Sequence, residues 1–246
     1  MAPTPTGGDE RGAPPERTAV ELLDHGIGLL NAGKCASAIR EGFDPAITRF
    51  GASVAEGTVV RAVRSDSPAA TLMRLIGTDE LGLRGTGAGG PGRSVVVLGP
   101  DYPDAHFFRA FCLVELGQFA DAEAALRVAL AMMPRDVVYS SELGHIRHQH
   151  RDWAGALAHF DDALRGVLDL RSSNGPVTGA SMMGMSLGDW HRRALRGRGF
   201  SLVELGRLDE AEAAYRQVLD IDASDAQARR ELDLIAELRR QGRSRP

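Results

Sequence analysis

The sequence lacks most of the features that would place a protein in a membrane or outside the cell. Its two cysteines are too few for a disulfide framework, so we expect reduced thiols in a reducing compartment. No apolar run approaches the roughly 18 residues that a membrane-spanning helix needs. The first residues are polar and rich in proline and glycine, unlike a secretion signal. We therefore expect a cytoplasmic protein with no membrane partner.

The chain also has little excess charge and few aromatic side chains. Its formal net charge is -4 over 246 residues, whereas nucleic-acid-binding domains are usually basic, so we expect no nucleic-acid partner. Aromatic residues make up 5% of the chain and hydrophobic residues 43%. A folded core is therefore expected, built from small and aliphatic side chains. That composition favours closely packed helices.

What the sequence does contain is an internal repeat. Three sets of residues share spacings of seven and then five positions, and the first two sets lie 34 residues apart. The sets are Ala110, Gly117 and Ala122; Gly144, Arg151 and Ala156; and Gly199, Gly206 and Ala211. This period predicts stacked helical hairpins, and Gly117 and Gly206 can adopt the left-handed backbone that ends a helix. Such arrays bind other molecules along their length and seldom carry chemistry.

The repeat divides the chain into three parts. Residues 1–16 should form a disordered tail, since they bury too little apolar surface to offset chain entropy. Residues 17–99 should form degenerate N-terminal helical repeats that include a glycine-rich loop at 82–94. Residues 100–240 should form the main array. Its parts are hairpins 103–134, 137–170 and 190–223, an insertion at 171–191, and a capping helix with a polar outer face at 225–240.

The start of the N-terminal part carries a fourth copy of the spacing, at Gly26, Gly33 and Ala38. Its second helix departs from the pattern at Pro45. Asp44 and Pro45 together are typical of an N-cap and a first helical position. We therefore expect a new helix over residues 45–55.

The end of the N-terminal part is ambiguous. Val95 to Leu98 have the composition of a short strand. Pro100, however, stands 34 residues before Pro134, which closes the next copy. We therefore favour the last turn of a helix in a degenerate repeat over a strand.

The repeated residues resemble the tetratricopeptide-repeat family. Its pattern combines a Leu-Gly pair in the first helix, an Ala-x3-Phe element in the second and a closing proline. The matching positions are Leu143-Gly144, Ala156-x3-Phe160, Ala211-x3-Tyr215 and Pro134. The resemblance implies an all-α fold, an α-solenoid of helix-turn-helix hairpins with a C-terminal capping helix. It also implies a non-catalytic adaptor or scaffold that binds another protein.

In this family, the first helices of successive hairpins line a concave groove that holds a peptide or a partner's helix. Carried over by repeat phase, the partner-binding groove of this chain would comprise Phe107, Phe111, Val114, His145, His148, Arg193, Arg196, Phe200 and Arg230. The arginines could grip a carboxylate through paired hydrogen bonds. Two alternatives stay open: the phenylalanines pack between hairpins, and the arginines face solvent. Chaperone-binding members clamp a terminal carboxylate with Asn and Lys, which this chain lacks at those positions.

A different hypothesis rests on the glycine-rich loop. Residues 87–94, GAGGPGRS, nearly match the phosphate-binding motif GxxxxGK[ST], and residues 85–90 match GxGxxG. Arg93 replaces the lysine, and the strand–loop–helix frame that aims amide dipoles at a phosphate is missing. A nucleotide-dependent enzyme or regulator using residues 85–94 is the alternative function. Self-association through an exposed end of the array is a third possibility.

Metal binding and catalysis find little support in the residue spacing. His145 and His148 share a helical face, but no cysteine or carboxylate joins them at a defined spacing, and a structural zinc site needs four ligands. These histidines could make partner binding sensitive to a pH of about 6–7. No nucleophile has an evident base beside it. We expect no catalytic residues, no metal and no cofactor.

Overall fold

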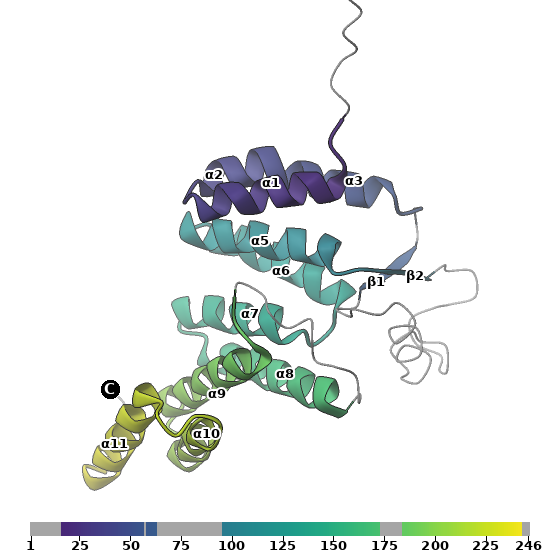
Figure 1. The fold of residues 1–246 in the computed structure, drawn as a ribbon. Helices are drawn as coiled ribbons and strands as arrows, with labels where there is room; N and C mark the ends of the chain where they lie inside the picture. The colour runs from purple at the N-terminus through teal and green to yellow at the C-terminus, as the bar shows by residue number, and fades with distance from the viewer. Residues whose placement is uncertain (1–15, 57, 63–94, 173–183, 243–246) are drawn as a thin grey trace, which may run out of the picture.

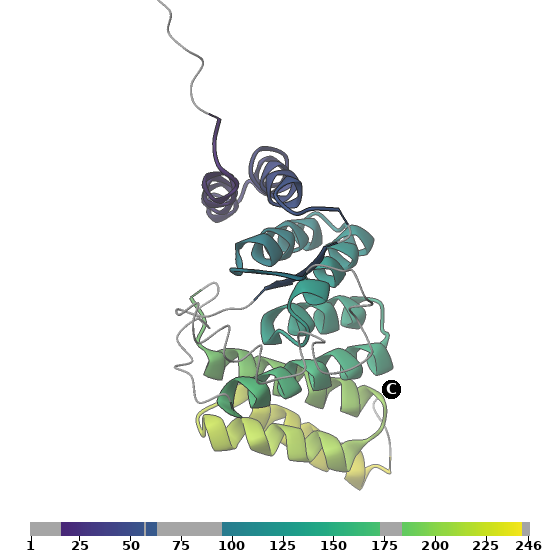
Figure 2. The same cartoon turned by 90° about the vertical axis from the view of Figure 1, so that its right-hand side faces the viewer.

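The computed structural model describes residues 16–56, 58–62, 95–172 and 184–242. Over these residues, antiparallel helix pairs are stacked in chain order from the N-terminal hairpin to the last helix (Figure 1). A view turned by 90° shows the pairs as successive layers (Figure 2). The predicted all-α solenoid is confirmed. The predicted tail (apart from Glu16), the loop at 82–94 and residues 173–183 of the predicted insertion lie outside the described residues.

The first hairpin pairs α1 (Ala19–Asn31) with a second arm made of three consecutive helical segments. These are α2 (Cys35–Ala38), a π-helical turn (Ile39–Phe43) and α3 (Asp44–Ala52). The two arms approach closely at Gly26 and Gly42, where a Cβ atom added to Gly42 would lie 2.3 Å from the Gly26 Cα atom. Glycine at both positions is therefore what lets the arms touch.

The expected helix over residues 45–55 is present as α3, which ends at Ala52, but Asp44 does not cap it as a new helix would require. The arm is helical from Cys35 to Ala52, and Pro45 is the second residue of α3. In the π-helical turn just before it, the Asp44 N–H donates to the Ile39 carbonyl oxygen, five residues back rather than four. This wider turn shifts the hydrogen-bond register at the place where proline has no N–H to donate.

Two short strands follow the first hairpin. One of them covers residues 95–98, so the helical turn predicted there is wrong. Strands β1 (Val59–Ala62) and β2 (Val95–Leu98) pair in parallel, with Val59 opposite Val95. The β-branched valines favour extended backbone once a partner strand lies beside them. β1 also contacts the following hairpin, because the Arg61 guanidinium donates to the Ala131 carbonyl oxygen at 2.9 Å.

The remaining helices form three further hairpins and a last single helix. They are α5 (Asp101–Glu115), α6 (Phe119–Met132), α7 (Val137–Gln149), α8 (Trp153–Ser172), α9 (Leu187–Glu204), α10 (Leu208–Ile221) and α11 (Ala226–Arg240). The turns between paired helices adopt the left-handed backbone that was expected: φ is +74° at both Gly117 and Gly206. Arg151 takes the same conformation, with φ of +56°, at the equivalent turn.

The apolar core is divided into three clusters along the array. The first lies in the N-terminal hairpin and against α5, the second spans α5 to α8 with the start of α9, and the third joins α9, α10 and α11. Phe108 packs against both the first and the second, and Leu164 against both the second and the third. Glycines again set close helix contacts, since the Phe160 ring leaves no room for a Cβ atom on Gly144 or Gly197.

Candidate functional site

An aromatic cluster joins α7, α8 and α9 at the centre of the predicted groove. The His148 ring lies 5.1 Å from both the Phe160 and the Phe200 rings and 5.6 Å from the Trp153 ring, measured between centroids. His145, one helical turn earlier, lies 5.1 Å from Phe160. The structure therefore brings His145, His148 and Phe200 into one aromatic cluster, in which their rings pack together with Phe160.

Burial controls the protonation of the two histidines. Burial, with Arg193 nearby as a further cause, lowers the pKa of His145 to about 3. Burial alone lowers the pKa of His148 to about 4. His148 also shares a hydrogen bond with Ser201, at 2.7 Å between Nε2 and Oγ. The lowered pKa values leave both rings neutral at a pH of about 6–7, which argues against the pH sensitivity of partner binding suggested for them in that range.

Arg193 is held between two helices rather than offered to a ligand. Its guanidinium forms an ion pair with Glu142 on α7 at 2.7 Å and lies 5.5 Å from the centroid of the Trp190 ring. Burial raises the pKa of Glu142 even though Arg193 opposes that shift. The Arg193 side chain thus crosses from α9 to α7 and stacks on its own helix, which fixes the distance between two first helices.

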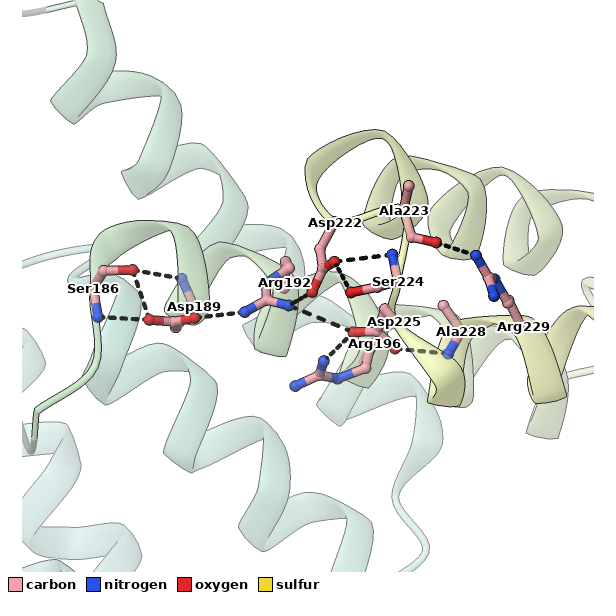
Figure 3. A network of polar contacts seen from close by, with 10 residues as sticks. All are labelled: Ser186, Asp189, Arg192, Arg196, Asp222, Ala223, Ser224, Asp225, Ala228 and Arg229. Carbon is pink, nitrogen blue, oxygen red and sulfur yellow. Dashed lines mark hydrogen bonds and ion pairs between the residues drawn. The ribbon is translucent and has the colours of Figure 1, made fainter.

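Arg196 is held in a network that joins α9 to the start of α11 (Figure 3). Its guanidinium donates to the Asp225 carboxylate at 2.6 Å, and Asp225 is the N-cap of α11, accepting from the Ala228 N–H. Arg192 pairs with both Asp189 and Asp222 in the same network. These arginines therefore neither face solvent freely nor stand ready for a partner's carboxylate, the two roles considered from the sequence.

Phe107 lies in the core, which is the packing role left open by the sequence. Its side chain is 1% exposed, and its ring lies 5.5 Å from the ring of Tyr139 on α7. The Tyr139 hydroxyl donates in turn to the Asp104 carboxylate, one turn before Phe107. These contacts join the first helices of two successive hairpins, so Phe107 supports the array from inside.

Besides the partly exposed His148 and Phe200 of the aromatic cluster, three predicted groove residues keep side-chain surface that a partner could reach. Phe111 and Val114 are partly exposed on α5, and Val114 also packs against the second core cluster. Arg230 is exposed on α11, where its Nε donates to the Ala226 carbonyl oxygen of its own helix at 3.2 Å. These side chains remain available at the two ends of the predicted groove.

Sequence reasoning missed the groups that hold the arginines. Asp225 could have been recognised, because an aspartate directly before an amphipathic helix is a typical N-cap. Glu142 gave no such signal, since it lies 51 positions before Arg193. Trp190 was treated as the start of a helix, yet it is 1% exposed, and its Nε1 has no hydrogen-bond partner within the described part of the chain.

Other kinds of site find no support in the described ranges. Among residues 16–56, 58–62, 95–172 and 184–242, no group of three or more metal-ligating side chains is present. No helix in the same ranges is long and apolar enough to span a bilayer. The glycine-rich loop at 85–94 lies outside them, but strand β2 begins directly after it, where a phosphate-binding loop would need a helix.

Comparison with known families gives two matches. One tetratricopeptide-repeat model matches residues 113–172, and a second matches residues 197–225. A search of curated proteins found no significant sequence match. The matched ranges overlap all three hairpins predicted from the repeat spacing, and the resemblance to this family is confirmed.

Solved structures resemble the chain in fold, at low sequence identity. A putative kinesin light chain from Podospora anserina with nearly identical TPR-like repeats gives a TM-score of 0.54 at 10% identity, over 89% of this chain and 85% of that one. The first TPR domain of Spaghetti (RPAP3), bound to an HSP90 peptide, gives 0.44 at 18% identity, over 55% of this chain and 93% of that one. The Cut9–Hcn1 assembly of the APC/C gives 0.44 at 19% identity, over 91% of this chain and 37% of that one. The first of these likenesses agrees with the solenoid fold.

Proposed function

This chain carries tetratricopeptide repeats, and on that premise we propose that it is a non-catalytic adaptor that binds a peptide or helix of another protein along the first helices of its hairpins. The observation that carries the proposal is the set of in-phase hairpins in which α5, α7 and α9 present equivalent positions. A solenoid of this kind offers an extended surface and builds no enclosed reaction site.

The predicted groove residues serve this proposal in two ways. One group positions the first helices through buried or ion-paired contacts, and it comprises Phe107, His145, Arg193 and Arg196. The residues proposed to contact the partner are Phe111, Val114, His148, Phe200 and Arg230. Because the two central arginines already have acidic partners, binding should rest on apolar and aromatic contacts, as in most interfaces where a few anchors dominate.

The partner chemistry follows from those contacts. An apolar or aromatic anchor would pack against Phe111 and Val114, where partly exposed hydrophobic surface lies on α5. At the other end, Arg230 is an exposed cation that an acidic side chain of the partner could approach. We therefore propose a segment with an apolar anchor followed by an acidic residue.

The proposal is tested by capture of partners on the full-length protein, followed by titration of the recovered partner segment. Phe111→Glu should weaken its affinity at least tenfold, since a buried aromatic anchor contributes about 2 kcal/mol or more. Val128→Glu is the matched control, because Val128 is 44% exposed on the second helix of the same hairpin. Equal affinity for the wild type and the Phe111 variant, with circular dichroism unchanged, would contradict the groove assignment.

A further inference from the structure

The two cysteines of the chain are brought together by the fold. They lie 77 positions apart in the sequence, and the chain has no others. Cys35 is the first residue of α2, in the second arm of the N-terminal hairpin, and Cys112 lies in α5 of the next hairpin. Both belong to the first core cluster, with Cys112 buried in it and Cys35 packed against it. The fold therefore places both cysteines in one core cluster at the boundary between two hairpins.

The surroundings of the two thiols differ in a way that suits a pair with separate roles. Cys35 is partly exposed, so a small oxidant can reach it, whereas Cys112 is buried. Burial raises the pKa of Cys112, and a hydrogen bond with the Cys35 thiol raises it further. Because Cys112 is buried, an oxidant in solution reaches it less readily than Cys35, so Cys112 stays reduced until the neighbouring sulfur has been oxidised.

We propose that Cys35 and Cys112 form a reversible disulfide when the protein meets a hydroperoxide, and that this bond fastens the N-terminal hairpin to α5. The proposal rests on the packing of α2 against α5 and on the place of both cysteines in one core cluster, and it does not depend on what the array binds. In a reducing compartment both thiols stay free, as in the structure described here.

The chemistry balances with one equivalent of hydrogen peroxide. The Cys35 thiolate attacks one peroxide oxygen, the O–O bond breaks, and the products are a sulfenic acid on Cys35 and hydroxide. Cys112 then attacks the Cys35 sulfur, forming the S–S bond and expelling the sulfenic oxygen as water. Overall, two thiols lose two electrons and two protons, and one peroxide becomes two waters. A small dithiol reverses the oxidation by exchange.

The bond would act on the end of the array. A crosslink between these residues closes a loop of 77 positions, which restricts the unfolded chain strongly. The hairpin it fastens has its own core cluster, centred on Leu22, Leu23 and Phe43. The disulfide would therefore prevent this terminal hairpin from separating from the rest of the stack.

The test uses the reduced full-length protein, with and without one equivalent of hydrogen peroxide. After oxidation, a tryptic digest should contain residues 35–40 linked to residues 110–127, and the link should disappear with dithiothreitol. The midpoint of thermal unfolding should rise by roughly 5–10 °C on oxidation, given the loop length and the size of the chain.

Two variants separate this reading from simple surface oxidation. Cys112→Ser should form a sulfenic acid on Cys35 that a dimedone probe traps, with no rise in the unfolding midpoint. Cys35→Ser should show no modification of the buried Cys112. The proposal is overturned if oxidised wild type gives a dimer linked through Cys35, a sulfinic acid on Cys35 as the main product, or two thiols that remain free.

Discussion

Arg196 and Asp225 join the α9–α10 hairpin to the last helix through an ion pair of 2.6 Å. The Asp225 side chain is 5% exposed and also caps α11 by accepting from the Ala228 N–H at 2.9 Å. Burial alone would raise the pKa of Asp225, but the capping bond and the two arginines hold it below its usual value. One carboxylate therefore both starts the capping helix and fixes it to α9.

Replacing this carboxylate should release the last helix. Asp225→Ala should lower the free energy of unfolding by about 2–3 kcal/mol, because both the cap and a charge-assisted hydrogen bond are lost. Asp225→Asn should cost about 1 kcal/mol less, since an amide oxygen can still cap the helix. Urea denaturation measures both changes. Asp233→Ala, on the exposed face of α11, is the control, and an equal loss there would refute a special role for Asp225.

Arg193 and Glu142 should be coupled in stability rather than in partner binding. In a double-mutant cycle with Arg193→Gln and Glu142→Gln, we expect a coupling energy of about 1 kcal/mol, because both side chains keep some access to solvent. Thermal or chemical unfolding of the four proteins gives this number. A coupling near zero would show that the ion pair does not hold α7 and α9 together. A charge reversal such as Arg193→Glu should destabilise the array by placing two carboxylates side by side.

The buried histidines should make the fold sensitive to acid. The pKa values of His106 and His148 fall to about 4 and that of His145 to about 3, all chiefly through burial. The unfolded chain therefore binds protons first, so stability should decrease as the pH falls from about 6.5 towards 4. His148→Gln should reduce the slope of unfolding free energy against pH by up to about 1.4 kcal/mol per unit.

The matched control for this experiment is His150→Gln, on the exposed turn after α7. Glutamine at 148 can still hydrogen bond with Ser201, so a change in slope would report the lost proton rather than a lost contact. An unchanged slope for His148→Gln would mean that this ring does not stay neutral in the folded protein.

Two glycines of the first hairpin should respond in opposite ways to alanine. Gly42→Ala places a Cβ atom 2.3 Å from the Gly26 Cα atom, so the arms must separate, at a cost of at least about 2 kcal/mol. Gly28→Ala meets nothing within 4 Å in the interior of α1 and should stabilise the helix by up to about 1 kcal/mol. Thermal unfolding followed by circular dichroism distinguishes the two. Similar midpoints for both variants would contradict the close approach of the arms.

The local features of the fold were predictable from the sequence because local rules govern them. The turns at Gly117 and Gly206 need a left-handed backbone, which glycine supplies. Gly144 lies under the Phe160 ring, so the glycine of the Leu-Gly pair packs against the phenylalanine of the Ala-x3-Phe element. Because the same contacts recur in each repeat, the spacing of the repeated residues alone was enough to predict the hairpins.

The features that the sequence did not reveal depend on contacts between distant segments. β2 becomes a strand because β1, 36 positions earlier, pairs with it. The roles of Arg193 and Arg196 depended on Glu142 and Asp225, which belong to other helices. Helical phase predicts that both arginines lie on one face of α9, but it does not predict which charged side chain each of them meets.

The division of the interior into three clusters has a mechanical consequence. Ile39 and Phe108 are shared between the first two clusters and Leu164 between the second and third, so most apolar contacts lie within a cluster rather than between clusters. Amide hydrogen exchange should therefore proceed at three distinct rates, with either terminus opening while the centre stays closed. A ligand that bridges both termini would slow amide hydrogen exchange in all three clusters together, so that the array would open as one cooperative unit.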